Sequence, residues 1–171
     1  MGFPMIPFPV NTVVTRGTAS TVNYPNGFPW TLGDRFVDER GRIFAFFEID
    51  AALAAAATPG PALSDSFSTG ELAYLKASLV VTNDVSDAID GADDPVVAGV
   101  ALGTLAESTS TTTVRAGLFL VSGRATIRTN ADDDVVAGDI LVIDTAVDGC
   151  CNSLDPDAET WIDDCDRCAG T

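Results

Sequence analysis

Four cysteines near the C-terminal end are the residues whose type and spacing most readily suggest chemistry. They form an adjacent pair, Cys150 and Cys151, and a C-x-x-C pair, Cys165 and Cys168. Four converging thiolates can hold a structural zinc ion, although an adjacent pair is poorly placed to chelate one ion. A redox C-x-x-C normally opens a helix in a βαβ setting, whereas this one ends a tail. We favour disulfides that join the first pair to the second, which require an oxidising environment. Free thiols and bonds between chains remain alternatives.

Aspartates form the second group of potential ligands. Asp155, Asp157 and Glu159 alternate along the chain, and residues 132–134 are three consecutive aspartates. Neither pattern has the central glycine and terminal glutamate of an EF-hand loop. We interpret both as solvated turn residues. We therefore expect no cofactor, and structural zinc at the four cysteines is the one alternative kept open.

The residue types needed for common catalytic sites are either missing from the sequence or do not form a recognised motif. The chain has no histidine, so a Ser-His-Asp triad is impossible, and Ser122-Gly123 lacks the G-x-S-x-G frame. Lys76 is the only lysine and the glycines are dispersed, which argues against a phosphate-binding loop. Paired carboxylates could serve a glycosidase, but among 25 acidic residues the sequence selects no pair. We expect that the protein is not an enzyme.

The charge balance restricts the partners. The 171 residues include 25 acidic and 9 basic side chains, for a net charge of -16. Such a chain repels nucleic acid and anionic membranes, and we expect neither as a partner. The acidity would also suit a saline environment or simple solubility. The N-terminal MGFPMIPFPV does not look like a signal peptide, and no apolar run is long enough to span a membrane.

Three regions follow from the distribution of residue types. Residues 1–33 are expected to form an extended arm, because five prolines prevent a long helix. Residues 34–144 are expected to form a β-rich core domain, and residues 145–171 an acidic tail that contains the cysteines. The aromatic residues of the arm are candidate docking anchors on a partner surface, namely Phe3, Phe8, Tyr24, Phe28 and Trp30. The alternative is that the arm folds back on its own domain.

The core begins with a predicted β-hairpin over residues 34–50 that turns at residues 38–41. Asp50 is a plausible cap for a short helix over residues 51–60, and a second short helix is expected after Ser68-Thr69. We predict a mainly β fold, a small β-barrel or β-tulip-like domain with one or two short helices.

Further strands are predicted from apolar alternation and turn residues. They cover residues 75–81, 96–105, 114–121, 124–129 and 140–143. The run 114–121 is almost wholly apolar, which is typical of a central strand. Gly99 and Gly103 indicate bulges or close backbone approach within 96–105. Residues 83–95 are expected to form an exposed loop.

Several of these runs resemble the β core of small tailed-phage capsid decoration, or cement, proteins. They are PVVAGVALGTL, TVRAGLFLVSGRATI and VVAGDILVID, preceded by GDRFVDERGRIFAFFEIDAALAAAA, and the resemblance covers roughly residues 32–144. It implies a β-barrel or β-tulip-like domain that assembles as a homotrimer on the outer surface of a bacteriophage capsid. There it would clamp adjacent subunits of the major capsid protein and stabilise the head of the virion.

Two other hypotheses compete with this expectation. A receptor- or glycan-binding module of a head fibre or tail would need exposed aromatic residues in its distal loops, and only Trp161 is aromatic after Phe119. A secreted domain of a cell-surface layer would be supported by a signal peptide.

Overall fold

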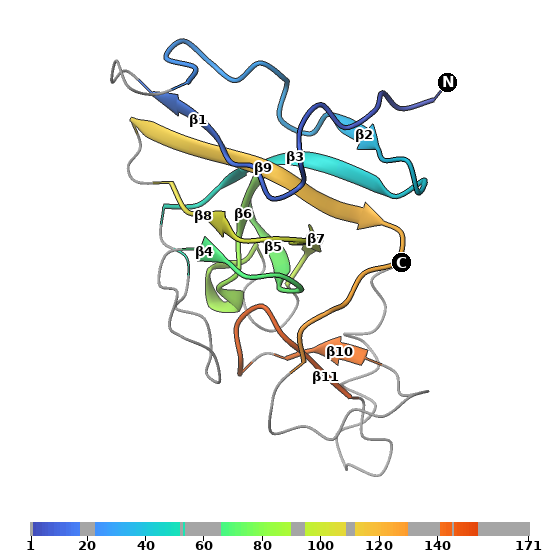
Figure 1. Cartoon of the computed structure of the whole chain (residues 1–171). Helices are drawn as coiled ribbons and strands as arrows, with labels where there is room; N and C mark the ends of the chain where they lie inside the picture. The colour runs from blue at the N-terminus through green and yellow to red at the C-terminus, as the bar shows by residue number, and fades with distance from the viewer. Residues whose placement is uncertain are drawn as a thin grey trace.

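Two apolar runs form the longest strands, β3 (Ile43–Ile49) and β9 (Thr113–Ser122). Both are rich in β-branched and aromatic residues, which fit a pleated and buried surface. The strands pair antiparallel along nearly their whole length, with Ala45 opposite Phe119 (Figure 1). The computed structural model describes residues 2–17, 23–51, 53, 66–89, 95–108, 112–129, 141–144 and 146–153.

The remaining strands are short. In chain order they are β1 (Val14–Gly17), β2 (Arg35–Val37), β4 (Ser66–Phe67), β5 (Leu72–Ala77), β6 (Val80–Thr82), β7 (Val97–Val100), β8 (Leu105–Ala106), β10 (Leu141–Ile143) and β11 (Cys151–Ser153). The helical content of the described residues is one 3₁₀ turn, η1 (Val85–Asp87). No helix in this part of the chain has the length and hydropathy needed to cross a membrane.

Five strands close a barrel in the order β3-β9-β7-β5-β6, and β6 returns to β3. The β3–β6 contact is parallel, whereas the other four contacts of the ring are antiparallel. Strands β1 and β2 extend the same sheet outside the ring, β1 from β9 and β2 from β3. The expectation of a mainly β protein with a small barrel is therefore confirmed.

Strands β3 and β9 are buried on both of their faces. Phe47 and Ile49 belong to the cluster inside the barrel, where they pack with Phe119. The alternate residues Phe44 and Phe46 belong to a second cluster on the opposite face. Burial on both faces explains why these strands read as nearly continuous apolar runs and not as alternating patterns.

The described part of the N-terminal arm covers this outer face. Phe8, Phe28 and Trp30 surround Phe46, with ring centroids 6.3, 5.5 and 5.9 Å from it. The angles between these rings and that of Phe46 are 74°, 86° and 80°, an edge-on arrangement that aromatic pairs favour. The arm thus supplies one wall of the second cluster.

The arm also lies along the two edge strands of the sheet. Met5 forms a parallel bridge with Val37 of β2, and Tyr24 forms one with Arg16 of β1. An uncovered sheet edge invites pairing with other chains. These two bridges therefore limit unwanted strand pairing at both ends of the sheet.

The hairpin of β10 and β11 packs at the opposite end of the molecule from the arm (Figure 1). Cys151 of β11 joins a third buried cluster with Leu72 and Tyr74 of β5. The N–H of Leu72 donates to the carbonyl of Gly149 at 2.9 Å, which links the barrel to the turn before β11. Residues 146–153, which the sequence assigns to the tail, are thus part of the packed structure.

The predicted hairpin over residues 34–50 is confirmed by β2 and β3, but the single strand predicted over 75–81 is wrong. The chain forms a hairpin there, because β5 ends at Ala77 and β6 begins at Val80. Leu79 makes the turn with a φ of 65°. Leucine rarely adopts positive φ, so its type gives no turn signal.

Other predicted elements of the core also differ. The second short helix, expected after Ser68-Thr69, is wrong because a turn there, with Gly70 at a φ of 88°, joins β4 to β5. Residues 124–128 form no strand, and the segment expected as one strand over 96–105 is divided between β7 and β8. The predicted close approach at Gly99 is confirmed, since a Cβ atom there would lie 2.7 Å from the carbonyl oxygen of Leu120. Most of the helix expected over 51–60 lies outside the described residues.

We predict that Trp30→Ala lowers the free energy of unfolding by about 3 kcal/mol, because it removes a large aromatic wall of the second cluster. Urea denaturation of the purified chain measures the change. Phe3→Ala is the matched control, since Phe3 is 45% exposed and its loss should change stability by less than about 0.5 kcal/mol. Equal effects of the two variants would contradict the role assigned to the arm.

Candidate functional surfaces

The structure separates the five aromatic docking candidates into two groups. Phe8, Phe28 and Trp30 are partly buried against the second cluster, as the alternative of a folded-back arm describes. Phe3 and Tyr24 are exposed, at 45% and 37% of their surface. Only the exposed pair is free to contact another molecule without disturbing the packing of the arm.

Two of the four cysteines lie in the described part of the chain, where Cys150 and Cys151 are buried free thiols. Burial raises the pKa of Cys151 to about 11, with a smaller contribution from Cys150, and it raises the pKa of Cys150 as well. Both are therefore protonated and weakly reactive at neutral pH. Cys165 and Cys168 lie outside the described residues, and so do the predicted disulfides and the alternative zinc site.

The aspartate patterns considered as calcium ligands, residues 132–134 and 155–159, also lie outside the described residues. Within the part of the chain that the structure describes, no group of three or more Cys, Asp or Glu side chains is arranged to hold a metal ion.

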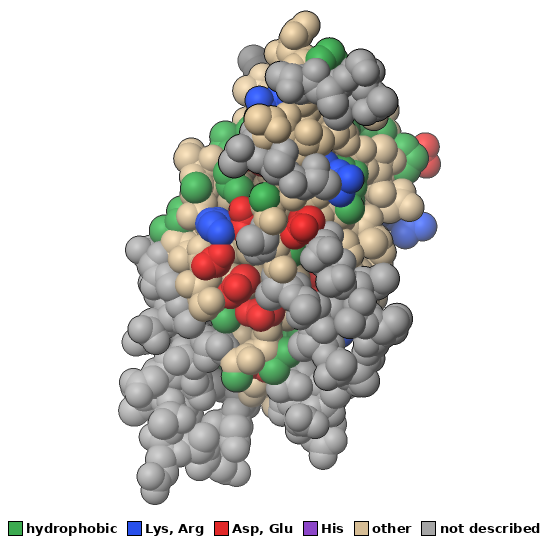
Figure 2. All heavy atoms as spheres, turned by 90° about the vertical axis from the view of Figure 1, so that its left-hand side faces the viewer, with side chains coloured by type: hydrophobic (Ala, Val, Ile, Leu, Met, Phe, Trp, Pro, Cys, Tyr) green, Lys and Arg blue, Asp and Glu red, His purple; other side chains and the backbone are tan. Residues whose placement is uncertain are grey.

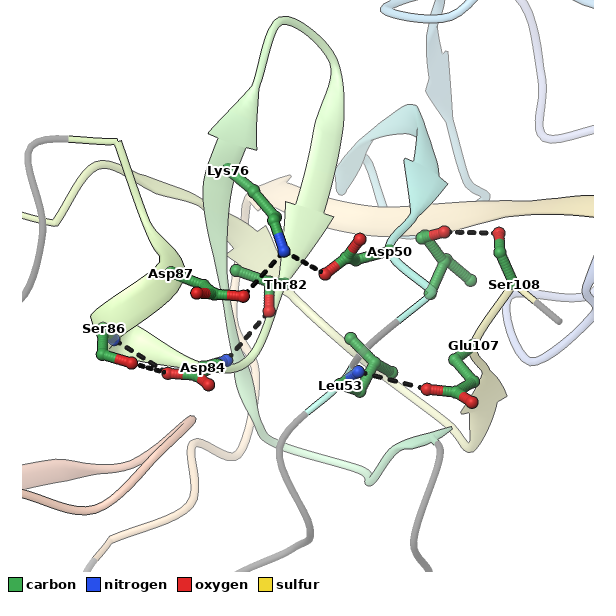
Figure 3. A network of polar contacts seen from close by, with 10 residues as sticks. Asp50, Leu53, Lys76, Thr82, Asp84, Ser86, Asp87, Glu107 and Ser108 are labelled. Atoms are coloured by element: carbon green, nitrogen blue, oxygen red, sulfur yellow. Dashed lines mark hydrogen bonds and ion pairs between the residues drawn. The ribbon is translucent and has the colours of Figure 1, made fainter. Parts of the chain in front are cut away.

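Acidic side chains gather on one face of the molecule, at the end where β3 stops (Figure 2). Lys76 of β5 binds Asp50 and Asp87, with its Nζ 2.8 and 2.6 Å from their carboxylates (Figure 3). Glu107 accepts a hydrogen bond from the N–H of Leu53 at 3.1 Å. We name the carboxylates of this face the acidic patch, which consists of Asp50, Asp84, Asp87 and Glu107.

Asp84 contributes to the patch through the cap of η1. It accepts hydrogen bonds from the backbone N–H and the hydroxyl of Ser86, at 2.9 and 2.6 Å (Figure 3). A short carboxylate before a helical turn satisfies backbone N–H groups that would otherwise lack a partner. Sequence reasoning missed this turn because it read residues 83–95 as one loop.

Two carboxylates near the patch are destabilised in their charged form. Burial raises the pKa of Asp148, whose carboxylate accepts from the N–H of Val85, and the nearby charge of Asp84 raises it further. Burial also raises the pKa of Glu48, although Arg16, 3.8 Å away, opposes the shift. The folded state is therefore more stable when these two carboxyl groups are protonated.

We predict that the chain becomes more stable as the pH falls from 7 toward about 5. A carboxyl whose folded pKa lies above its unfolded value destabilises the fold while it is charged, and this cost is removed as it protonates. Lower net charge acts in the same direction. Urea midpoints at the two pH values test this, and Asp148→Asn should reduce the difference. A midpoint that falls between pH 7 and 5 would contradict the assignment.

A buried ionic contact joins the barrel to the segment that leads to β10. The side chain of Glu71 is fully buried, and its carboxylate lies 2.7 Å from the guanidinium of Arg128. The same carboxylate accepts the N–H of Ser68 at 2.8 Å. A buried carboxylate needs such partners because its desolvation is costly. The sequence offered one signal, a single glutamate between Gly70 and an apolar strand.

A hollow of about 500 Å³ lies at the other end of β3, before the strand begins. Its lining consists of Val10, Arg40, Arg42, Thr69, Leu102, Arg124, Ala125 and Thr126. We name it the arginine hollow. Three of the chain's eight arginines line it, whereas no acidic residue of the described part of the chain does, which is unusual in a chain of net charge -16.

Arg42 is the one arginine of the hollow with a carboxylate partner among the described residues. Its Nε donates to Asp38 at 2.8 Å, and its guanidinium lies 5.5 Å from the ring centre of Phe44. Burial acts to raise the pKa of Asp38, but hydrogen bonds from Arg42 and Arg40 outweigh it and hold the pKa below its usual value. Asp38 thus remains charged and fixes the position of Arg42.

The described surface therefore offers contacts of three kinds: exposed apolar side chains on the arm, an acidic patch at one end of β3, and an arginine hollow at the other. None of the sequence-predicted candidates forms an arrangement with evident catalytic geometry in this part of the chain. In comparisons with protein-family models, curated proteins and solved structures, nothing matched this chain.

Proposed function

We propose that this chain is a virion structural protein that binds the outer surface of an icosahedral capsid. As a homotrimer it would clamp adjacent subunits of the major capsid protein and stabilise the head. The exposure of Phe3, Met5 and Tyr24 on an arm that is otherwise anchored is the observation that carries the proposal.

The arm presents these side chains in a fixed position. Phe3 and Met5 are 45% and 53% exposed, while Ile6 and Phe8 pack inward against the second cluster. Anchored apolar groups lose little conformational freedom on binding, so more of their burial contributes to affinity. Aromatic side chains placed in this way often carry most of the binding energy of an interface.

The body of the chain suits the solvent side of such a particle. Like charges on a surface keep particles apart, and the net charge of -16 supplies them. Binding at many equivalent sites on a shell allows weak individual contacts to hold firmly, because linked copies rebind before the whole assembly leaves.

We expect virus particles purified from the source of this sequence to contain the chain in a simple ratio to the major capsid protein. Quantitative mass spectrometry measures that ratio, and a value near one or a simple fraction supports a symmetric decoration of the shell. A few copies per particle would overturn the proposal and favour the alternative of a receptor- or glycan-binding head-fibre or tail module. Complete absence from particles would also overturn it.

We predict that the double variant Phe3→Ala/Tyr24→Ala binds capsids stripped of this protein at least about tenfold more weakly than the unchanged chain. Its unfolding midpoint should stay unchanged, because both side chains are exposed. Leu141→Ala is the matched control, since Leu141 is an apolar residue of β10 that is 37% exposed and remote from the arm. Equal binding by both variants would exclude the arm as the docking surface.

A further inference from the structure

We propose that the arginine hollow binds the acidic patch of a second copy of the chain, so that copies associate head to tail. This inference deepens the proposed function, since it names the contact that would build its symmetric assembly. It concerns the purified chain alone, and its failure would leave capsid binding to be decided separately.

The two surfaces lie at opposite ends of the same pair of strands. Arg42 precedes the first residue of β3 and Asp50 follows its last, and a seven-residue strand is about 23 Å long. Arg124 follows the end of β9, which runs the other way. In Figure 1 the β2–β3 turn and the arrowhead of β9 lie on the right, whereas Figure 2 shows the acidic side chains on the left-hand face. Each copy therefore presents the arginine hollow at one end of this strand pair and the acidic patch, with Lys76 within it, at the other.

The arginine hollow has unused capacity for an anion. Arg40 and Arg124 have exposed side chains and form no ion pair among the described residues. The guanidinium group of Arg42 binds Asp38 through its Nε, and the backbone N–H of Arg42 also donates to Asp38. A guanidinium group offers five N–H donors in a planar fork that matches a carboxylate, so the hollow selects planar carboxylates.

The acidic patch has the complementary capacity. The bonds within the described residues use only one oxygen of each carboxylate: Oδ2 of Asp50 and Asp87, Oδ1 of Asp84, and Oε2 of Glu107. Lys76 pairs with Asp50 and Asp87, whereas the carboxylates of Asp84 and Glu107 bond to Ser86 and to the backbone of Leu53 (Figure 3). The oxygens that these bonds leave unused can accept hydrogen bonds from a guanidinium group of a second copy.

An apolar surface continues from the arginine hollow and adds contact area. A second hollow of about 480 Å³ shares Arg124 and Ala125 with it and reaches Val97 of β7, which is 44% exposed. An apolar area bordered by polar and charged residues is typical of a protein contact. A contact between unlike surfaces of identical chains closes into a ring when its rotation allows, and three copies would meet the symmetry of the proposed function.

Light scattering coupled to gel filtration tests the association. We expect the unchanged chain to have about three times its monomer mass of 17.7 kDa at low salt. Arg40→Glu/Arg124→Glu should raise the dissociation constant at least about tenfold. Arg35→Glu is the control for an added negative charge, because Arg35 is exposed on β2 and does not line the hollow. Rising salt should weaken the association, as screening requires.

A mixing experiment distinguishes head-to-tail contact from any other. Arg40→Glu/Arg124→Glu retains a functional acidic patch, whereas Asp84→Lys/Asp87→Lys retains a functional hollow. Each should be monomeric alone, and the two together should form a 1:1 complex that cannot grow further. Because Asp84 caps η1, Asp87→Lys alone serves as a second variant if the double change impairs folding.

The proposal is overturned if the unchanged chain is monomeric, or if the arginine variant associates as strongly as Arg35→Glu. It is also overturned if the two folded variants fail to combine, since a head-to-tail contact leaves each of them one working surface.

Discussion

The two-sided burial of the β3–β9 pair is the constraint on which the other parts of the structure depend. One face of the pair forms the barrel wall, so β5, β6 and β7 must close around Phe47, Ile49 and Phe119. The other face, with Phe44 and Phe46, would be a large exposed apolar surface if it were left uncovered. The N-terminal arm covers it. In the sequence, this segment rich in proline and aromatic residues resembles a free docking arm. Its packing shows that most of it stabilises the fold, and that only its exposed side chains are available for contacts with other molecules.

Several aspartates and arginines also stabilise the fold locally. Asp38, Asp84 and Asp144 each accept backbone N–H groups in turns, a task for which a short carboxylate is well suited. These three carboxylates therefore have a structural role in a fold made of short strands and many turns. Arginines such as Arg128 are engaged by buried or neighbouring acids. Against this pattern, the described lining of the arginine hollow contains three arginines and no acid, and two of them, Arg40 and Arg124, form no ion pair among the described residues.

The fold class, the hairpin of β2 and β3, and the central position of β9 could be predicted because long apolar runs and turn residues mark them directly. The β5–β6 hairpin could not, since its turn depends on Leu79 at positive φ. The candidate functional surfaces were harder to predict from the sequence than the fold. Phe8 and Trp30 lie in the same proline- and aromatic-rich segment as Phe3. Only the packing of Phe8 and Trp30 around Phe46 distinguishes them from the exposed Phe3. The arginine hollow joins residues from the β2–β3 turn and from the end of β9, a proximity that no local pattern contains.

The pairing of β3 with β9 also sets the order in which the protein can form. Ala45 pairs with Phe119, which lies far along the chain, so a large loop must close before either strand has its central partner. Folds dominated by such distant pairings form slowly. During synthesis, β3 leaves the ribosome with two apolar faces before its partner strand β9 has been made. An apolar strand without its partner is prone to aggregate, and the arm, which precedes β3 in the chain, carries the residues that cover one of its faces.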